Sequence, residues 1–134
     1  MYHQRAESPL RLNGLEAARR FFATCLAETD PDSEHLWVAH VDDQARCIHL
    51  SRHDGGKGGA SLPLREVISD VATHGSAGVI LAHNHPGGDP TPSADDRQIT
   101  RRLVLAAEAI DLTVLDHIVM AGRECRSMRA MGLL

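Results

Sequence analysis

The stretch 79–96 constrains the fold more than any other part of the chain. It begins with the apolar run 79–82, which predicts a buried strand, and continues directly into His83 and His85. Residues two apart on a strand lie on the same face, so both imidazoles are expected to point the same way. A turn rich in glycine and proline follows, and Ser93 then predicts the start of a helix. This stretch therefore predicts a strand, a tight turn and a helix, with two histidines at the strand end.

Hydrophobic periodicity along the rest of the chain predicts an alternation of strands and helices. The first two strands are close enough in sequence to form a hairpin, and the later strands are separated by helices. This pattern is typical of a single-domain α/β fold with a mixed β-sheet flanked by helices. We expect residues 13–134 to form this domain and residues 1–12 to form an N-terminal tail. The predicted elements are helices over 14–28, 63–74 and 94–110, and strands over 34–41, 46–51, 77–83, 113–120 and 124–126.

Three local expectations concern helix ends, helix faces and one connection. Asn13 is a suitable N-cap for the first helix. The glycine-rich segment 54–59 lacks the spacing of a phosphate-binding loop, so it predicts a hairpin connection, with a short strand over 60–62 after it. The helix after Ser93 is expected to turn one apolar stripe inward, made of Ile99, Leu103, Ala107 and Ile110.

The composition is that of an ordinary globular domain. Hydrophobic residues make up 43% and charged residues 24% of the 134 residues. No apolar run approaches the roughly 20 residues that span a bilayer, and the first residues lack a signal-peptide pattern. The three cysteines are far apart, which argues against a disulfide framework and favours a reducing, cytoplasmic location. We therefore expect no membrane association.

The charge of the chain argues against binding to nucleic acid. The formal net charge is −4, whereas non-specific binding depends on basic side chains that neutralise phosphates. Aromatic residues make up only 3%, so few side chains can stack on unpaired bases. The nine histidines are many for this length, and we expect most of them to lie on the surface.

The two histidines at the strand end predict half of a metal site, because neutral imidazole is a common metal ligand. Catalytic zinc usually has three protein ligands and a water, so a third ligand is needed nearby. The candidates are Asp89, Asp95 and Asp96. Asp96 is favoured, because Ser93-x-x-Asp96 has the form of a capping box that holds the carboxylate at the helix start. Asp89 lies within the turn and ranks second, and Asp95 points about 100° away around the helix.

A zinc-dependent hydrolase also needs a general base that takes a proton from water. Glu34 is a candidate because it opens the first strand, although a solvated residue at a strand entry gives the same pattern. Glu28 and Glu66 are not excluded. Ser93 has two candidate roles: it can act only as the helix cap, or its hydroxyl can also stabilise negative charge on the substrate oxygen. The turn thus predicts zinc as the cofactor and leaves the base open.

The spacing of these residues resembles a known family. His83-x-His85, seven residues, Ser93, two residues and Asp96 match the JAMM signature of the JAB/MPN metallopeptidases without a gap. The resemblance covers roughly residues 8–134 and implies a JAB/MPN-like, cytidine-deaminase-like architecture. Hallmarks of the RadC-like branch are also present, as His83-Asn84-His85-Pro86, Gly88-Asp89, Pro92-Ser93 and Leu115-Asp116-His117-Ile118.

The resemblance implies a role for each residue of the signature. By it, His83, His85 and Asp96 bind zinc together with a water. Glu34 matches the upstream glutamate that serves as the general base, and Ser93 matches the serine that supports the tetrahedral intermediate. Active JAMM relatives cleave peptide or isopeptide bonds, including links to ubiquitin-like modifiers, so a peptide or protein substrate is expected.

The chain also departs from the RadC-like pattern. Gly87 stands where a serine is usual, which should spare the ligands but changes the stiffness of the turn. Many RadC-like proteins carry an N-terminal helix-hairpin-helix region that is not found in these 134 residues, which weakens an inference of DNA binding. Asp116 and His117 match the branch, and we expect them to form a buried structural pair.

Two functions from different classes remain. One is a zinc metallopeptidase or isopeptidase-like hydrolase. The other is a non-catalytic JAB/MPN-type module that binds a protein or DNA in a DNA-repair or mobile-element setting. The position of Glu34 distinguishes them, because a carboxylate more than one bridging water from the metal ligands would leave a hydrolase without its base.

Overall fold

The computed structural model describes residues 10–55 and 62–134. Within them the chain forms three helices and five strands that belong to one sheet. The elements are α1 (Leu15–Ala27), β1 (His35–Val41), β2 (Cys47–Asp54), α2 (Leu64–His74), β3 (Gly78–Asn84), α3 (Ala94–Glu108), β4 (Thr113–Ala121) and β5 (Glu124–Ser127).

The sheet is mixed, as expected from the alternation of strands and helices. Its strand order is β2-β1-β3-β4-β5. The β3–β4 pair is parallel and is connected by α3, whereas the other three pairs are antiparallel. The prediction of a single-domain α/β fold with a mixed sheet flanked by helices is therefore confirmed.

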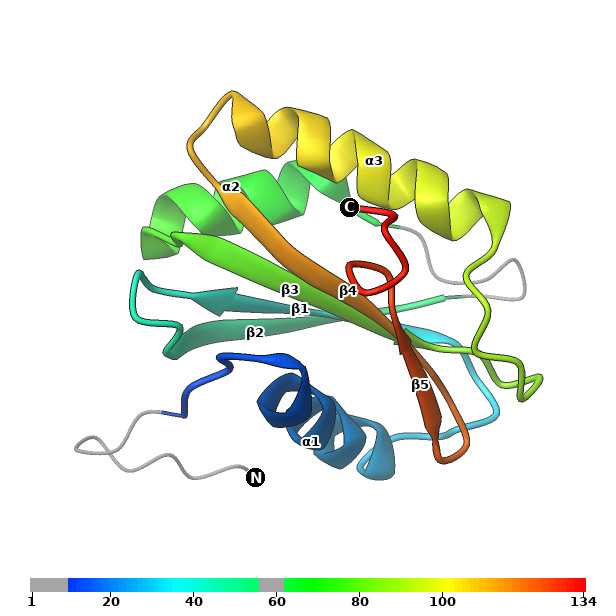
Figure 1. Ribbon diagram of the computed structural model, residues 1–134. Helices are drawn as coiled ribbons and strands as arrows, with labels where there is room; N and C mark the ends of the chain where they lie inside the picture. The colour runs from blue at the N-terminus through cyan, green and yellow to red at the C-terminus, as the bar shows by residue number, and fades with distance from the viewer. Residues whose placement is uncertain (1–9, 56–61) are drawn as a thin grey trace.

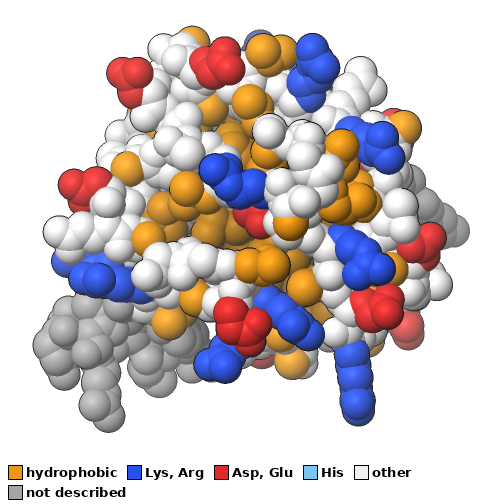
Figure 2. Space-filling model, viewed as in Figure 1, with side chains coloured by type: hydrophobic (Ala, Val, Ile, Leu, Met, Phe, Trp, Pro, Cys, Tyr) orange, Lys and Arg blue, Asp and Glu red, His pale blue; other side chains and the backbone are white. Residues whose placement is uncertain are grey.

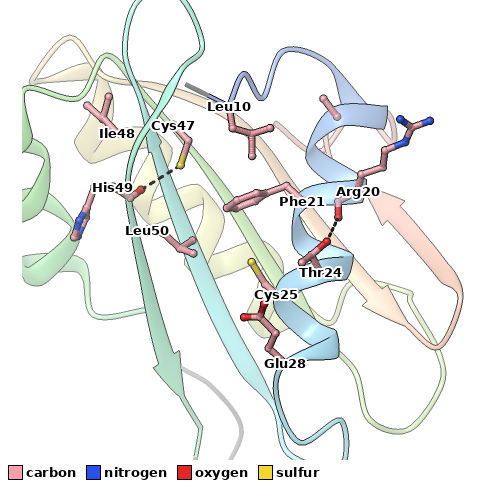
Figure 3. A pocket seen from close by; sticks show the side chains of 11 residues that line it. Leu10, Arg20, Phe21, Thr24, Cys25, Glu28, Cys47, Ile48, His49 and Leu50 are labelled. Carbon is pink, nitrogen blue, oxygen red and sulfur yellow. Dashed lines mark hydrogen bonds between the residues drawn. The ribbon is translucent and has the colours of Figure 1, made fainter. Parts of the chain in front are cut away.

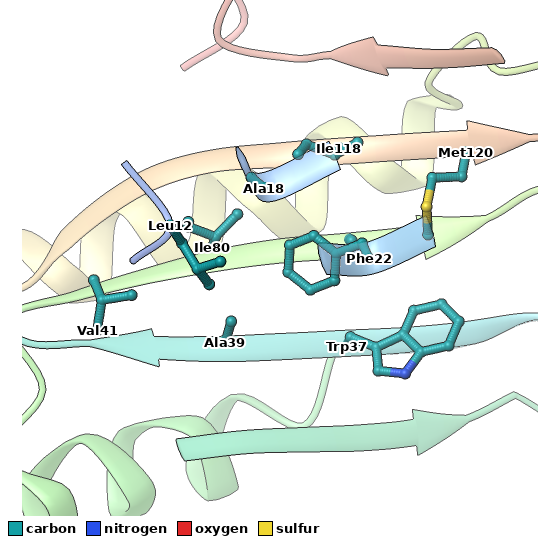
Figure 4. Close-up of a cluster of buried hydrophobic side chains, with 10 residues drawn as sticks. Leu12, Ala18, Phe22, Trp37, Ala39, Val41, Ile80, Ile118 and Met120 are labelled. Atoms are coloured by element: carbon teal, nitrogen blue, oxygen red, sulfur yellow. The ribbon is translucent and has the colours of Figure 1, made fainter. Parts of the chain in front are cut away.

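The helices cover both faces of the sheet, with α1 on one face and α2 and α3 on the other (Figure 1). On the α1 face, Ala18 and Phe22 of the helix pack against Trp37 of β1 and Ile118 of β4 (Figure 4). These two helical residues are four apart and so lie on one side of α1. This contact fixes α1 across the middle of the sheet.

The opposite face is packed by α2 and α3. Alternate residues of the central strands point to it, such as Val38 of β1 and Leu81 of β3, and they meet Val67 of α2 and Leu103 of α3. All seven residues of β3 are buried, in agreement with the expectation that its apolar run is covered on both faces. The end of β3 is therefore a rigid position from which to place side chains.

Several details differ from the sequence expectations. Gly14, not Asn13, is the N-cap of α1, and its positive φ of 101° suits glycine. In α3, Leu103 and Ala107 are buried as expected, but Ile99 is half-buried and Ile110 is exposed, and Thr100 is buried as well. The hydroxyl of Thr100 has buried hydrogen-bond partners, which explains how a polar side chain can replace an apolar one there.

Some expectations fall on residues outside the described part of the chain. Residues 1–9 of the expected tail, most of the connection over 54–59 and most of the short strand over 60–62 belong to this group. Within the described part of the tail, Leu12 is buried in the α1-side core, and Arg11 pairs with Arg46 as an isolated bridge.

The surface carries both signs of charge. In the view of Figure 2, acidic and basic side chains are interspersed around a hollow lined by hydrophobic side chains. Among the described residues, no helix has both the length and the apolar character needed to cross a membrane.

Candidate metal centre

Three segments of the chain meet at one end of the central strands β1 and β3. Because β1 runs antiparallel to β3, the start of β1 lies beside the end of β3, and Leu36 is paired with His83. The chain then turns and enters α3, whose first turn faces the end of β3. This topology brings Glu34, which precedes β1, close to the His-x-His sequence and to the start of α3.

The side chains of these segments converge on one point. The Nε2 atoms of His83 and His85 are 2.9 Å apart. His83 Nε2 lies 3.2 Å from Asp96 Oδ1, and His85 Nε2 lies 3.1 Å from Asp96 Oδ2. One carboxylate oxygen of Glu34 is within 4.8 Å of a ligand atom of each of the other three residues. The structure thus brings Glu34, His83, His85 and Asp96 together.

The competing acids lie elsewhere. The Asp95 side chain is exposed, and the Asp89 carboxylate accepts a hydrogen bond from the Thr91 amide within the turn. Glu66 lies 3.6 Å from a ring nitrogen of His53. Glu28 lines a groove of about 600 Å³ between α1 and β2 (Figure 3), on the opposite face of the sheet from α3. Of the acids weighed from sequence, Asp96 and Glu34 are the two at the centre.

Hydrogen bonds fix the tautomer of His85. Its Nδ1 lies 2.7 Å from the backbone carbonyl of Asp89, which can only accept a hydrogen bond. Nδ1 therefore carries the hydrogen. In the neutral ring, Nε2 then has a lone pair that points toward Asp96.

A buried chain of hydrogen bonds fixes the tautomer of His83 in the same way. The Thr100 hydroxyl donates to the Asp96 carbonyl at 2.7 Å, so it accepts from His117 Nδ1 at 2.6 Å. His117 is 2% exposed, and burial, followed by its neighbour His83, lowers its pKa to about 3. It is therefore neutral, and its Nε2 accepts a hydrogen from His83 Nδ1 at 2.7 Å. The Nε2 atom of His83 is left with a lone pair.

These tautomers make the group a suitable set of zinc ligands. His83 Nε2 lies 2.9 Å from His85 Nε2 and 3.2 Å from Asp96 Oδ1, and each of these three atoms presents a lone pair, an arrangement that a cation stabilises and that is repulsive without one. Tetrahedral zinc with bonds of about 2.0–2.1 Å holds its ligand atoms about 3.3 Å apart. The His85 side chain is 19% exposed, so the centre is accessible to solvent on that side.

Asp96 has a second function at the start of α3. Its Oδ2 accepts the Ser93 amide at 2.7 Å, and its own amide donates to Ser93 Oγ at 3.0 Å, which completes the expected capping box. Burial raises the pKa of Asp96, whereas a hydrogen or a cation held between His83 Nε2 and the carboxylate lowers it, and the hydrogen bonds with Ser93 lower it further. The net pKa is below the ordinary value, so the carboxylate is ionised at neutral pH.

Glu34 is held through its neighbours. The Asn84 side chain, between the two histidines in sequence, accepts the His35 amide at 2.7 Å and donates to the Ser33 carbonyl at 2.9 Å. The Glu34 carbonyl accepts the Gly55 amide at 2.9 Å. The backbone on both sides of Glu34 is therefore attached to the strand end that carries the histidines.

Three residues that support the centre, Asn84, His117 and Thr100, were not given this role from the sequence. Asn84 and His117 lie inside motifs that were noted, but nothing in a single sequence shows what their side chains contact. Thr100 gave no signal except its place one turn after Asp96. The expectation that Asp116 and His117 form a buried pair is wrong for their side chains: the Asp116 carboxylate accepts the backbone amides of His117 and Arg129, whereas the His117 ring binds His83.

Gly87 has little effect on this geometry. A Cβ atom at Gly87 would meet nothing within 4 Å, and its φ is not positive, so a serine would be accommodated. Gly88 has a φ of 91° and is the residue of the turn that favours glycine.

Comparison with known proteins gives one family. Residues 12–133 match the family model described as the RadC-like JAB domain. A UPF0758 protein of Symbiobacterium thermophilum is 53% identical over 130 residues, which cover 95% of this chain and 55% of that protein. UPF0758 protein YfjY of Escherichia coli is 34% identical over 96% of this chain and 79% of its own length. A UPF0758 protein of Bordetella petrii is 37% identical over 88% of this chain. The chain spans about half the length of most of these relatives.

Proposed function

Because the chain belongs to the RadC-like JAB domain family, we propose that it is a zinc-dependent hydrolase of peptide or isopeptide bonds. In this proposal His83, His85 and Asp96 hold the zinc. Glu34 is the general base, and the Ser93 hydroxyl stabilises negative charge on the substrate oxygen. The observation that carries the proposal is the position of Glu34, whose carboxylate lies within 4.8 Å of the three ligand atoms.

The Glu34 carboxylate is near enough to the three ligand atoms for one water to lie between it and a metal ion that they hold. A zinc–oxygen bond of about 2.1 Å and a hydrogen bond of about 2.7 Å allow a carboxylate up to about 4.8 Å from the metal position. The side chain is half-buried, and the backbone on both sides of Glu34 is held by Asn84, so its backbone needs little ordering when substrate binds. If more than one water separated the Glu34 carboxylate from the metal position, Glu34 could not act as the general base.

The reaction follows from these positions. Zinc held at this centre would lower the pKa of a water and polarise the substrate carbonyl. Glu34 accepts a proton from the attacking water and delivers it to the amine as the carbon–nitrogen bond breaks. The products are a carboxylate and an amine. Ser93 Oγ already accepts the Asp96 amide, so its own hydrogen can be donated to the carbonyl oxygen as negative charge develops there.

A zinc and hydrolysis assay on three variants tests this proposal. The variants are His83→Ala, Glu34→Gln and, as a control, Asp95→Asn, which changes an exposed acid beside Asp96. Zinc content per chain and cleavage of a panel of fluorogenic peptide and isopeptide substrates are measured. His83→Ala should lose one zinc per chain and all cleavage. Glu34→Gln should keep that zinc and lose cleavage by about 10²-fold or more, the usual contribution of a general base.

Two results would contradict the proposal. One is an unchanged zinc content in His83→Ala, and the other is full cleavage by Glu34→Gln. A zinc-loaded protein that cleaves nothing and binds duplex DNA in a salt-sensitive manner would favour the non-catalytic binding module instead.

A further inference from the structure

A second cluster of histidines lies between β1, β2 and α2. His40 of β1 and His49 of β2 are direct cross-strand partners, and a register shift follows them. Asp70 and His74 are one turn apart on α2. The rings of His40 and His49 are 5.2 Å apart, and the His74 ring stacks on that of His49 at 4.0 Å.

Three members of this cluster have metal-ligand spacing. One ligand atom from each of His40, His49 and Asp70 lies within 4.8 Å of the other two. His49 Nε2 is 3.6 Å from Asp70 Oδ2. This distance is too long for a good hydrogen bond, but the two atoms still face each other. Figure 3 shows the His49 ring pointing away from the apolar groove beside α1. The ligand set of two imidazoles and one carboxylate suits zinc and neighbouring first-row divalent ions.

The independent sign of a ligand is the second nitrogen of His40. The residue is 0% exposed, and within residues 10–55 and 62–134 its Nε2 has no hydrogen-bond partner. A buried polar atom without a partner destabilises the folded state, so such atoms are rare. Its Nδ1 lies 2.8 Å from Ser76 Oγ. This is the usual environment of a metal-binding histidine, in which one nitrogen is held by a second group and the other faces the metal.

The protonation of His40 agrees with this role. Burial, followed by the neighbouring His49, lowers the pKa of His40 to about 4. The ring is therefore neutral at physiological pH, the form that binds metals.

We propose that His40, His49 and Asp70 bind a divalent transition-metal ion such as Zn²⁺ at a second site, separate from the centre at His83. The bound ion links the edge strand β2 to β1 and α2. Two of the nine histidines are accounted for in this way, and neither is exposed, since His40 is buried and His49 is half-buried, contrary to the expectation of a mostly exposed set.

The packing of β2 explains why such a link is useful. β2 lies at one end of the strand order, and among the strands in the described part of the chain it pairs with β1 alone. Its side toward α2 carries polar residues, since His49 faces Asp70 and His53 faces Glu66. A metal ion between β2 and α2 would supply the stabilisation that apolar side chains supply elsewhere on this face.

The test uses Zn²⁺ and the intact chain, in a background that removes the first centre. Metal-free His83→Ala protein is titrated with Zn²⁺ against a chelator of known affinity, and its Tm is measured with and without Zn²⁺. We expect one Zn²⁺ per chain and a rise in Tm, because a ligand that binds the folded state stabilises it. Adding His49→Gln or Asp70→Asn should weaken binding more than about tenfold, since even outer ligand partners contribute about 10–100-fold.

These two side chains are about 30% exposed, so their replacement should leave the fold intact. The matched control is His53→Gln, which removes an imidazole from the same side of β2 but outside the cluster. It should keep the affinity and the rise in Tm. The proposal is overturned if His83→Ala protein binds no Zn²⁺, or if His49→Gln and Asp70→Asn bind it as tightly as the background does. Neither result bears on hydrolysis, which the variants of the first centre test separately.

Discussion

At the scale of single residues, the candidate centre depends on which nitrogen of each histidine carries the hydrogen. A backbone carbonyl decides this for His85, and the chain from Thr100 through His117 decides it for His83. Both rings then present a lone pair to the same point. The ligand geometry is therefore prepared by residues that do not themselves touch the metal position.

The Thr100 hydroxyl can be removed with little change of shape. Thr100→Val should weaken zinc binding at the His83 centre by about 10–100-fold, because His117 loses the acceptor that fixes its tautomer. Thr100→Ser keeps the hydroxyl and should bind zinc within a few-fold of the parent protein. Chelator competition in a His49→Gln background measures the affinity. Equal affinities for the valine and serine variants would show that the chain does not set the tautomer of His83.

Single residues also show how far the sequence could go. Asp96 was chosen over Asp89 and Asp95 because a capping box fixes where its carboxylate lies, and the structure brings this carboxylate to the histidines. That constraint is local and so is visible in sequence. The contacts of His117 with His83 and Thr100 join residues 34 and 17 positions apart, and they arise only when α3 packs on the sheet.

At the scale of elements, the site exists because β1 and β3 are antiparallel. This places the beginning of one strand beside the end of the other, and Asn84 joins the two through the Ser33 and His35 peptides. The hydrophobic patterns predicted each strand but not their order in the sheet. The proximity of Glu34 to the histidines therefore came from the resemblance and not from periodicity.

Loss of the Asn84 side chain should affect the fold directly. Asn84→Ala leaves the buried amide of His35 without its partner and should lower the free energy of unfolding by about 1–3 kcal/mol. Gln98→Ala, an exposed change on α3, should alter it by less than about 0.5 kcal/mol. Urea unfolding of metal-free protein measures both. A cost for Asn84→Ala no larger than that of the control would refute the proposed tie between the two strands.

The role of Ser93 as the N-cap of α3 can be tested separately from its proposed role in hydrolysis. Ser93→Ala removes the acceptor of the Asp96 amide and should cost about 0.5–2 kcal/mol of stability. Ser93→Thr keeps a hydroxyl at the cap and should retain most of that stability. Thermal unfolding of the metal-free proteins compares them. An alanine variant as stable as the parent would mean that Ser93 does not stabilise the helix.

At the scale of the whole molecule, buried histidines make the fold sensitive to acid. Burial lowers the pKa of His40 to about 4 and that of His117 to about 3. In the unfolded chain both groups have a pKa near 6.5. The native state therefore favours the neutral rings, and this contribution is complete above about pH 6.5 and is lost as the pH falls toward 4.

Metal-free protein should accordingly lose stability between pH 6.5 and pH 4.5. Each of the two histidines contributes a slope of up to about 1.4 kcal/mol per pH unit in this range. Urea unfolding at several pH values measures the slope, and His40→Gln should reduce it by the share of one histidine. A free energy of unfolding that is independent of pH over this range would contradict the buried, neutral state of both rings.

The central claim is that Glu34, His83, His85 and Asp96 form one zinc centre with a base at the distance of one water. The most direct measurement is a crystal structure of the zinc-loaded protein with the anomalous signal of zinc. The account predicts a peak about 2.0–2.2 Å from His83 Nε2, His85 Nε2 and Asp96 Oδ1. It also predicts a solvent oxygen on that zinc within hydrogen-bond distance of the Glu34 carboxylate. No peak at this position, or a Glu34 carboxylate farther away than one bridging water, would contradict it.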